Sequence, residues 1–489
     1  MNLFDRFRAK FHGGIQPVEW KETANCPIQR LALSEQYILP MKQHIGQECV
    51  PLVAVGDRVL RGQKVARSQA YVHAPIHAPT SGIVRKIADN PIPHPSGLGM
   101  LSLFIEADGL DEEKKMPCLA DYRNIDPVLI REQVRMAGIT GLGGAGFPAF
   151  IKHRRDDEFP VHTVILNGVE CEPWLTNDHR LMLEHGQQIV EGLDILMHVV
   201  GAKKGIIAIE SNKPDAALNI QQCIADFSQD MEVRILPTRY PQGGEKQLIQ
   251  VVTGKEVPAG KLPLHIGVLC QNIGTVKSIY DAVVLGKSLT ERVVTISGPQ
   301  TPRRGNSLVR IGTDLSFILS QHGLTDLSEV KVIHGGPMMG ELLPNLHVPA
   351  VKSTTGLLAW HTAEFEKSHE QPDPCIHCGH CVQVCPVKLV PNELASHCKH
   401  DDTERAQAYH LFDCIECGCC SYVCPSHIPL VQHFRYAKGM VAQQAREQKF
   451  SEESRQRSEA HLQRIEKEKE ARAARRAKVL AKQKALEEK

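Results

Sequence analysis

The strongest constraint on how this 489-residue chain folds is a cysteine pattern that occurs twice. Residues 375–386 read Cys-x2-Cys-x2-Cys-x3-Cys-Pro, and residues 414–425 repeat the same spacing. In this spacing three thiolates surround one face of an iron–sulfur cube, and the cysteine next to proline ligates the other cluster. We therefore predict two [4Fe-4S] clusters with exchanged fourth ligands. The first cluster is expected on Cys375, Cys378, Cys381 and Cys424, and the second cluster on Cys414, Cys417, Cys420 and Cys385.

Structural zinc is the alternative explanation for Cys-x2-Cys pairs. Structural zinc normally has four protein ligands in total, so zinc does not explain a run of three cysteines followed by Cys-Pro. Repetition of the whole run at the same offset favours iron–sulfur clusters. The segment from Cys375 to Pro425 resembles the bacterial two-cluster ferredoxin domain, which implies electron transfer between neighbouring clusters.

Length, charge and cysteine use narrow the class of protein. A chain of 489 residues is long enough for roughly three domains, each with its own core. A net charge of +1 gives no electrostatic footprint for nucleic acid. Half of the 16 cysteines lie in the cluster motifs, and clusters need reduced thiols, so we expect a cytosol-facing protein.

Two features of the sequence bear on membranes. No apolar run approaches the roughly 18 residues of a membrane span, so any membrane association is expected to be indirect. The N-terminal segment, residues 1–30, lacks the apolar region of a secretion signal. Phe4, Phe7 and Phe11 would share one face of a helix, which would rest on a membrane, on a partner or on the protein itself.

Strand and turn signals between residues 31 and 115 predict a small β module. Gly56-Asp57, Gly62 and Ser81-Gly82 supply turn chemistry between β-branched runs. The pattern resembles a biotinyl/lipoyl-type sandwich, whose carriers present a lysine at a hairpin tip. The tip region here, residues 67–73, contains no lysine. We therefore expect a structural or docking module rather than a swinging arm.

Residues 120–286 are expected to form an α/β domain. Asp126-Pro127 opens a helix, because Asp is a good N-cap and Pro suits the first helical position. Strands and helices then alternate, with strands near 163–167, 205–210 and 232–237 and helices near 181–199 and 215–227. This βαβ pattern predicts a parallel sheet covered by helices, whose ligands sit beyond the carboxyl ends of the strands.

The rest of the chain divides into three parts. A smaller β-rich module is expected at 287–350, and a linker at 362–374 opens the ferredoxin-type segment, 362–440. From 441 to 489 the composition shifts to Ala, Gln, Glu, Lys and Arg, with favourable i,i+4 charge pairs. Few apolar residues repeat there, so this tail is predicted to be a solvated single helix or disordered.

A glycine-rich stretch at residues 141–148 reads Gly-Leu-Gly-Gly-Ala-Gly-Phe-Pro. It follows a helix, so it is not the strand–GxGxxG–helix fingerprint, and a tight structural turn is the alternative. Glycines expose backbone N–H groups and allow a phosphate to approach closely. Lys152 adds a positive charge, and Gly243-Gly244-Glu245 begins a second helix whose N-terminus favours an anion.

The order of the motifs is more specific than any single one. Gly-Gly-Ala-Gly-Phe-Pro, Asn-Gly-x-Glu-x-Glu-Pro, Gly-Gly-Glu and Gln-Asn-x-Gly-Thr precede a β module and the cysteine motifs. This order resembles the flavin-bearing, NADH-oxidising subunit of respiratory complex I, except that two cluster motifs replace a single-cluster region. The succession of lipoyl-like module, flavin-type domain, β-grasp module and ferredoxin-type domain resembles the C subunit of the Rnf ion-translocating ferredoxin:NAD oxidoreductase complex. The implied fold class is multidomain α/β with small β modules.

The resemblance implies FMN as cofactor and NAD(H) as substrate, with no catalytic acid, base or nucleophile, because the cofactors carry the chemistry. It places phosphate-side FMN contacts at Gly141, Gly143, Gly144, Gly146 and Lys152. It lines the flavin and nicotinamide face with Asn167, Glu170 and Glu172. It closes the site with Gly244, Glu245, Asn272 and Thr275. For the three glutamates, the alternative is an ordinary surface carboxylate.

The function that the resemblance implies is electron transfer between NAD(H) and ferredoxin-type carriers, through FMN and two clusters, coupled to ion translocation by the whole complex. Such a chain would be a peripheral subunit on the cytoplasmic side of the inner membrane, bound indirectly through the other subunits. Nucleic acid is not an expected partner. Two alternatives stay open: a soluble flavin/iron–sulfur NADH dehydrogenase, and an electron-wiring or docking subunit with an empty flavin site. Neither the ion nor the direction of electron flow follows from sequence.

Overall fold

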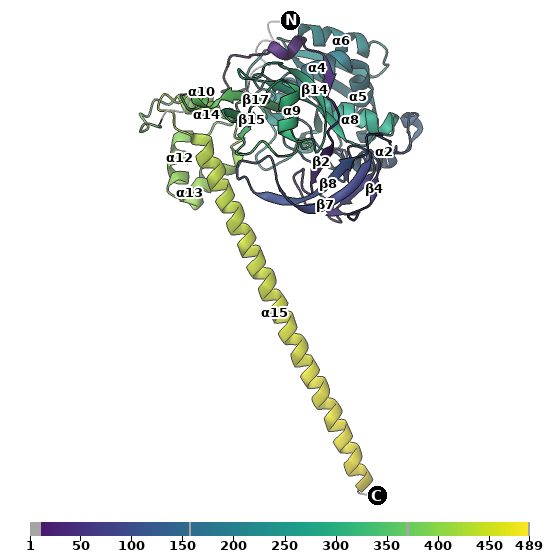
Figure 1. The fold of residues 1–489 in the computed structure, drawn as a ribbon. Helices are drawn as coiled ribbons and strands as arrows, with labels where there is room; N and C mark the ends of the chain where they lie inside the picture. Colours follow the sequence, from purple (N-terminus) through teal and green to yellow (C-terminus); the bar gives the residue numbers. More distant parts are fainter. Residues whose placement is uncertain (1–10, 156–157, 368–370, 488–489) are drawn as a thin grey trace. The chain divides into compact units, whose positions relative to one another are not determined.

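The computed structural model describes residues 11–155, 158–367 and 371–487, which fall into two compact units. The first unit comprises Met1–Lys388 and Cys417–Ile428, and the second comprises Leu389–Glu416 and Pro429–Lys489. All of the sheets among the described residues belong to the first unit (Figure 1).

Two small antiparallel sheets form the N-terminal β module. One has strand order β2-β8-β7-β4 and the other has order β3-β5-β6. Leu39, Val65 and Leu103 from the two sheets are fully buried, and their core is continuous with that of the central α/β domain. The expected strands are present as β2 (Gln36–Pro40), β3 (Val50–Pro51), β4 (Arg58–Val59), β5 (Lys64–Arg67), β6 (Ile76–His77), β7 (Gly82–Pro91) and β8 (Gly99–Ala107).

The hairpin tip of this module, residues 67–73, contacts the next domain. Arg131 donates a hydrogen bond to the Tyr71 hydroxyl oxygen (2.8 Å). The rings of Tyr71 and Phe150 meet edge to face, with centroids 5.8 Å apart. The tip therefore packs on its own chain.

The central α/β domain contains four parallel strands in the order β11-β10-β9-β12, which confirms the predicted parallel sheet. The sequence did not predict the last of these strands, Val268–Asn272. The strands are β9 (Thr163–Gly168), β10 (Lys204–Glu210), β11 (Asp230–Leu236) and β12 (Val268–Asn272).

Alternate side chains of the sheet face two helix layers, as the period of a strand requires. Val164 packs with Leu193 of α5, whereas its neighbour Ile165 packs with Leu248 of α7. The helices are α2 (Pro127–Met136), α3 (Ala149–Lys152), α4 (Asn177–Glu184), α5 (Gly186–Val200), α6 (Pro214–Ile224), α7 (Glu245–Thr253) and α8 (Ile273–Val284), with short 3-10 turns η1 (Glu22–Asn25), η2 (Tyr122–Asn124) and η3 (Pro263–Ile266).

The single helix predicted near 181–199 is wrong, because the chain forms α4 and α5 there. His185 leaves helical geometry with φ −132° between them. A Cβ on Gly186 would lie 2.6 Å from the Asn219 amide nitrogen of α6. The break thus occurs where glycine admits a closely packed neighbouring helix.

The mixed-sheet module has six strands in the order β1-β14-β13-β17-β15-β16. Its central strand, β17, pairs in parallel with β13 and antiparallel with β15. The module predicted at 287–350 therefore extends through β17, where Leu357, Leu358 and Ala359 are fully buried. The elements are β1 (Ile28–Arg30), β13 (Glu291–Ser297), β14 (Gly305–Arg310), α9 (Leu315–Gln321), β15 (Val330–His334), β16 (Glu341–Leu342) and β17 (Gly356–His361).

The described part of the N-terminal segment, residues 11–30, packs against these modules. Strand β1 pairs in parallel with β14. Phe11 is only 3% exposed and packs in the core beneath α7. Phe11 is therefore not available to a membrane or a partner, and Phe4 and Phe7 lie outside the described residues.

Short helices carry the cysteine motifs of the first unit. Gly379 precedes α11 (His380–Val384), and Gly418 precedes α14 (Cys419–Tyr422). The expected linker at 362–374 is not wholly irregular, since it begins with α10 (Thr362–Lys367).

The second unit is helical. Its elements are α12 (Pro391–Lys399), α13 (Thr403–Ala408), the turn η4 (Leu411–Asp413) and α15 (Leu430–Glu487). Leu394, Leu411 and Phe434 are buried, and α12 packs on the first turns of α15 (Figure 1).

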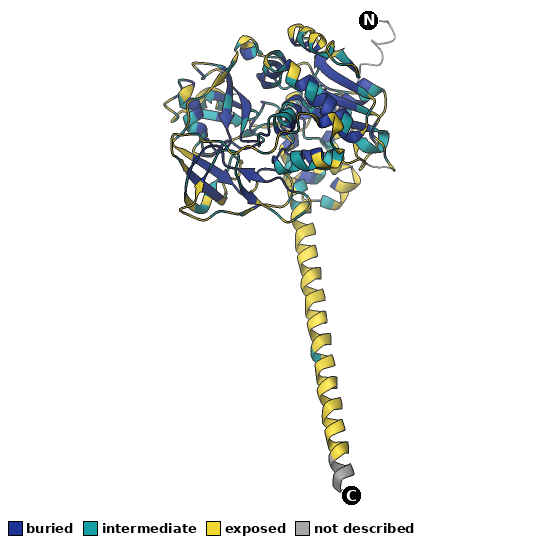
Figure 2. Ribbon diagram, turned by 90° about the vertical axis from the view of Figure 1, so that its right-hand side faces the viewer, coloured by how far each residue is buried: buried dark blue, intermediate teal, exposed yellow. Residues whose placement is uncertain are grey.

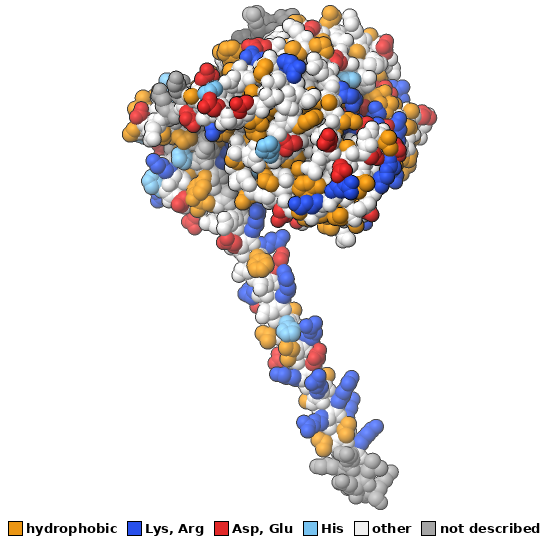
Figure 3. All heavy atoms as spheres, viewed as in Figure 1, with side chains coloured by type: hydrophobic (Ala, Val, Ile, Leu, Met, Phe, Trp, Pro, Cys, Tyr) orange, Lys and Arg blue, Asp and Glu red, His pale blue; other side chains and the backbone are white. Residues whose placement is uncertain are grey.

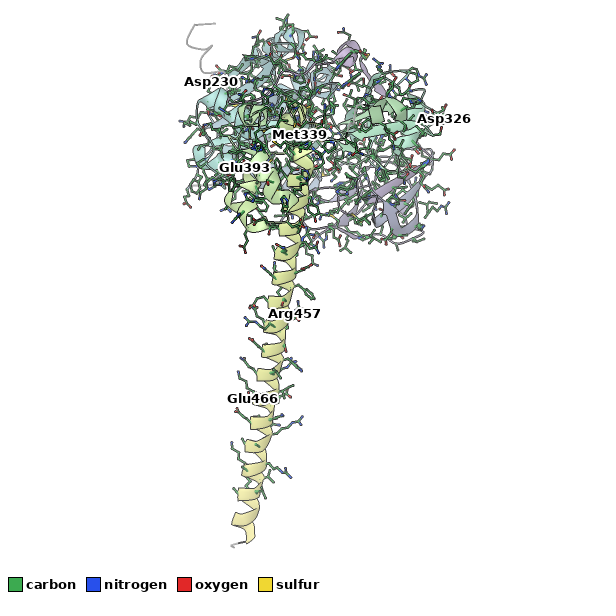
Figure 4. The ribbon with its side chains drawn as sticks, turned by 90° about the vertical axis from the view of Figure 1, so that its left-hand side faces the viewer. Asp230, Asp326, Met339, Glu393, Arg457 and Glu466 are labelled. Atoms are coloured by element: carbon green, nitrogen blue, oxygen red, sulfur yellow. The ribbon has the colours of Figure 1, made fainter. Side chains whose placement is uncertain are left out.

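The tail left open as helical or disordered is a helix, α15, of 58 residues that already starts at Leu430. Figure 2 shows it exposed along most of its length, and Figure 3 shows cationic and anionic side chains side by side on it. Arg457 and Glu466 extend away from the helix (Figure 4). Each exposed ion pair of this kind contributes little to the stability of the helix. Within the described residues, no helix has the length and apolar composition that crossing a membrane requires.

Candidate functional site

Two parallel strands end side by side where the sequence placed a ligand. Asn167 of β9 is in register with Asn272 of β12. Asn272 also caps α8, because its side-chain oxygen accepts a hydrogen bond from Thr275 N–H (3.3 Å). The Asn167 amide donates to the carbonyl of Gly243 (2.8 Å), just before Gly244 at the N-cap of α7. Two helix N-termini thus meet this edge of the sheet and favour an anion there.

The glycine loop is held at Leu142 from two directions. Leu142 N–H donates to Thr275 Oγ1 (2.9 Å), and the Leu142 carbonyl accepts from Arg292 Nη2 (3.1 Å). Thr275 is fully buried, and Arg292 is 5% exposed. Burial lowers the pKa of Arg292 to about 10, so the guanidinium stays charged at neutral pH. The loop therefore has a fixed backbone course before any ligand binds.

Gly143 and Gly144 explain the glycine content of the loop. A Cβ on Gly143 would lie 3.2 Å from the Asn272 Cβ, so glycine lets the loop close on the start of α8. Gly144 has φ +118°, and a Cβ there would meet nothing within 4 Å. Backbone that faces open space beside a helix N-terminus is a suitable cradle for a phosphate. The residues present therefore fit a phosphate-bearing cofactor such as FMN.

The other two predicted glycines are held by backbone hydrogen bonds. Gly141 N–H donates to the Phe147 carbonyl (2.7 Å), which closes the base of the loop. The Gly146 carbonyl accepts from Ile45 N–H of the N-terminal β module (3.2 Å). These two glycines shape and anchor the loop.

Lys152 and Glu245 contact each other. The ammonium and the carboxylate are 2.7 Å apart, and the two side chains are 32% and 37% exposed. The lysine thus reaches the start of α7. The Lys152 ammonium is paired with Glu245, the first residue of that helix. A phosphate bound here would have to displace the Glu245 carboxylate from the ammonium or share the ammonium with it.

The Glu170 carboxylate caps a helix. It accepts hydrogen bonds from the N–H groups of Asp178 (2.8 Å) and His179 (3.3 Å) at the start of α4. The Asp178 carboxylate in turn accepts from the Asn272 amide (2.6 Å). Burial, followed by repulsion from Glu170, raises the pKa of Asp178 to about 7. Glu170 is thereby linked through Asp178 to the cap of α8.

The Glu172 carboxylate binds a distant loop. It accepts from the N–H groups of Met338 (3.1 Å) and Met339 (2.9 Å), and burial raises its pKa to about 7. Figure 4 labels Met339 among the side chains of the first unit. Lys21 fixes the same segment by donating to the carbonyls of Glu170, Glu172 and Leu175, at 2.7–2.8 Å.

The sequence missed several residues that shape the site. Arg292 and Lys352 come from the mixed-sheet module, and Lys352 donates to the Gly138 carbonyl just before the glycine loop (2.7 Å). Neither has a local motif, because each acts through a backbone carbonyl far away in sequence. Asp178 did have a signal: an acidic residue in the first turn of a helix near a strand end.

The two cysteine motifs have matching backbones. Gly379 and Gly418 occupy the same place in each repeat and have φ +77° and +78°. Two further pairs of matched positions hold residues with positive φ: His377 and Glu416 at 55° and 58°, and Lys388 and His427 at 58° and 49°. Positive φ is uncommon outside glycine. The sequence repeat is therefore also a conformational repeat.

The cysteines differ in burial. Cys375 and Cys378 are exposed, whereas Cys385, Cys417 and Cys420 are 6–7% exposed. Cys414 belongs to the second unit. Among the described residues, no three His, Cys, Asp or Glu side chains converge as ligands of one metal ion do. A cluster of four irons spreads its ligands around a larger body, so this observation concerns single-ion sites.

A loop suited to a phosphate-bearing cofactor and a repeated cysteine loop on one chain define an electron-transfer protein of the flavin/iron–sulfur class. Three parts of the chain match known families: residues 9–110 the RnfC barrel sandwich hybrid domain, residues 134–281 the Nuo51 FMN-binding domain, and residues 367–450 the 4Fe-4S dicluster domain. These matches confirm the predicted flavin-type and iron–sulfur domains.

Relatives identify the family. The C subunits of the ion-translocating oxidoreductase complex from Salmonella dublin and Salmonella gallinarum are each 44% identical to this chain over 480 residues, which is 97% of its length and 68% and 71% of theirs. The chain belongs to this family of C subunits. Two crystal structures of NAD+-reducing [NiFe]-hydrogenase, air-oxidized and H2-reduced, have TM-scores of 0.45 and 0.47 at 20% and 19% identity. Those matches cover 58% and 66% of this chain and 54% and 64% of the hydrogenase chains.

Proposed function

We propose that this chain is the electron-transfer subunit of an ion-translocating oxidoreductase complex, linking NAD(H) to ferredoxin-type carriers through FMN and two [4Fe-4S] clusters. The observation that carries the proposal is the glycine loop. Thr275 and Arg292 hold the loop through hydrogen bonds to the backbone of Leu142, and Gly144 faces open space beside the N-terminus of α8. Membership of the family of C subunits gives independent support.

The FMN phosphate would lie against the backbone of Gly143 and Gly144, where the helix N-termini of α7 and α8 favour negative charge. Lys152 would add its charge by turning from Glu245 towards the phosphate. FMN supplies the conversion between a two-electron hydride and single electrons. Thr275 and Arg292 hold the loop in shape, so little ordering is needed on binding.

The three polar residues at and after the end of β9 are proposed to have different roles. Asn167 lies at the strand end and is proposed to face the flavin and nicotinamide. Glu170 is a positioning residue, because its carboxylate acts on Asn272 through Asp178. Glu172 is proposed to border the nicotinamide face while it holds the loop at Met338 and Met339.

The cluster ligands are proposed to be the two sets given by the sequence. The first cluster uses Cys375, Cys378, Cys381 and Cys424, and the second uses Cys414, Cys417, Cys420 and Cys385. The matched positive-φ positions in the two loops support equivalent cluster binding by each.

The remaining modules are proposed to be structural. The N-terminal β module is lipoyl-like in its paired sheets, and its lysine-free tip docks on the central α/β domain. The strand order β14-β13-β17-β15-β16, with α9 between β14 and β15, supports a β-grasp assignment for the mixed-sheet module. We propose domain bounds of 31–115 and 120–286, a β-grasp module from 287 through β17, and a ferredoxin-type segment at 362–440 whose residues belong to both compact units.

The partners are proposed to be the other subunits of an Rnf-type complex, with ferredoxin-type carriers reached through them. The chain would lie peripherally on the cytoplasmic side of the inner membrane and would bind it indirectly.

Anaerobic purification of the whole chain tests the proposal. We expect about eight irons and eight sulfides per chain, from the doubled motif, together with bound FMN that bleaches on mixing with NADH. Intact clusters without flavin would favour the electron-wiring alternative. Isolation of the active protein alone from a membrane-free cell fraction would favour the soluble dehydrogenase.

A further inference from the structure

A short N-terminal segment, residues 11–15, connects the central α/β domain to a cysteine motif, and is called the strap below. Phe11 anchors it, being 3% exposed among Val169, Leu248 and Ile249. The Arg239 guanidinium lies 5.3 Å from the centre of the Phe11 ring. The start of the strap is therefore fixed in the core of the flavin-type domain.

The strap forms hydrogen bonds on both of its sides. Ile15 and Tyr240 exchange backbone hydrogen bonds of 2.8 and 2.9 Å. On the other side, Gly14 N–H donates to the Val384 carbonyl (2.8 Å), and His12 Nδ1 donates to the Cys385 carbonyl (3.0 Å). A carbonyl can only accept, so this contact fixes the proton on Nδ1. The strap thus binds the backbone of a predicted cluster ligand.

The strap approaches the motif too closely for any side chain. Gly13 has φ +67°, and a Cβ there would lie 2.5 Å from the Val384 oxygen and 2.7 Å from the Cys385 oxygen. A Cβ on Gly14 would lie 2.6 Å from the Tyr240 oxygen. Consecutive glycines at positions 13 and 14 are therefore required by contact on both sides.

Tyr240 makes a second connection between the flavin-type domain and the cysteine motifs. Its hydroxyl donates to the Cys417 carbonyl (2.6 Å), and the side chain is 1% exposed. Next to it, a Cβ on Gly418 would lie 2.9 Å from the Met338 carbonyl, in the loop whose N–H groups bind Glu172. Cys385 and Cys417 are both predicted ligands of the second cluster.

We propose that the strap and Tyr240 dock the second cluster against the flavin-type domain, so that it is the first to exchange electrons with the flavin. The first cluster, whose Cys375 and Cys378 are exposed, then passes electrons to or from a redox partner. One hydride would supply two electrons, one for each cluster, and its proton would be released from the flavin to solvent; the partner would remove the electrons in turn. This inference rests on the proposed function, and assigns His12 and Tyr240 as positioning residues.

The positioning role is tested with Tyr240→Phe, and Tyr422→Phe on the exposed face of α14 is the matched control. Tyr240→Phe should keep full iron and sulfide content and normal flavin bleaching by NADH. Reduction of the clusters by NADH should slow by up to about three- to tenfold, the factor by which loss of one buried hydrogen bond lowers the equilibrium constant for docking. The EPR signal of the second cluster alone should shift. Unchanged cluster reduction and unchanged signals in Tyr240→Phe would overturn the proposal.

The order of the clusters is tested by removing one at a time. Cys378→Ser should keep the second cluster and Cys417→Ser the first, as confirmed by iron content and EPR. NADH should reduce the remaining cluster quickly in Cys378→Ser and slowly in Cys417→Ser, while dithionite reduces both. The reverse pattern refutes the order. If NADH reduces neither cluster in the unchanged protein although dithionite does, the proposed function itself fails.

Two measurements remain decisive if a cysteine variant loses both clusters. A soluble gadolinium complex should broaden the EPR signal of the exposed first cluster more than that of the second in the unchanged protein. Gly13→Ala should weaken NADH-driven cluster reduction, whereas Gly56→Ala should not, because Gly56 has φ +97° with nothing within 4 Å of an added Cβ. Equal broadening, or equal effects of the two alanines, contradicts the docking.

Discussion

Thr275→Val should weaken FMN binding without disturbing the rest of the central α/β domain. The substitution keeps the shape of a fully buried side chain but removes the oxygen that accepts the Leu142 N–H hydrogen bond (2.9 Å). A buried N–H left without a partner costs about 1–3 kcal/mol. If that free energy falls on loop closure, FMN affinity drops by about 5- to 150-fold.

Titration of the flavin-free protein with FMN, followed by quenching of flavin fluorescence, measures this loss. Thr275→Ser is the matched control, because it keeps the hydroxyl and deletes only a methyl group. Thermal unfolding of both variants separates general destabilisation from a specific loss of binding. If Thr275→Val unfolds at a lower temperature but binds FMN as tightly as the unchanged protein, the loop does not set the affinity.

Arg292→Lys extends the test, because one ammonium cannot reproduce the fork that bonds the carbonyls of Leu142 and Lys352. If Thr275 and Arg292 hold the same loop, their effects on FMN binding should be non-additive in the double variant. Strict additivity would mean that the two contacts act independently and that Leu142 is not their shared point of action.

Three further outcomes are expected. Gly144→Leu should abolish FMN binding, because the leucine side chain fills the open space beside the loop. Gly254→Leu is the control: Gly254 also has positive φ and nothing within 4 Å, so that variant should suffer only backbone strain. Equal FMN binding by both variants would contradict a phosphate site at Gly144. Burial raises the pKa of Asp178 from 3.8 to about 7, so the folded protein favours the protonated acid. The free energy of unfolding should therefore fall as the pH rises from about 4 to about 7. In Asp178→Asn, the free energy measured by urea unfolding should lack this part of the pH dependence. Cys424→Ala should damage the first cluster, as measured by iron content and EPR; loss of the second cluster alone would contradict the exchanged-ligand assignment.

Much of the central α/β domain was predictable, because its signals are local. Strand runs such as 205–210 alternate with helices, and Asp126 caps α2 by accepting a hydrogen bond from Val128 N–H, as its position before proline suggested. Strand β12 was missed, since Val268–Asn272 is short and merges into the cap of α8. The break between α4 and α5 was missed because it depends on α6, which packs there from a distant part of the sequence.

The site was predictable as a set of segments but not as a set of contacts. Asn167 and Asn272 do come together at adjacent strand ends, as a parallel sheet requires. The partners of the glutamates were not predictable, because Glu172 binds N–H groups 166 and 167 positions away. A buried carboxylate needs hydrogen-bond donors, and the donors available to it are set by the packing between modules, which no local sequence pattern encodes.

The mixed-sheet module explains why this chain needs more than a flavin domain and a cluster domain. Arg292 on β13 and Lys352 before β17 each hold a carbonyl next to or within the glycine loop. At the same end of that sheet, the Met338 loop after β15 contacts both Glu172 and Gly418 of the second cysteine motif. One sheet thus contacts the glycine loop and the second cysteine motif at once. Because one sheet contacts both loops, their separation is fixed, as it would not be by a flexible linker between two independent domains.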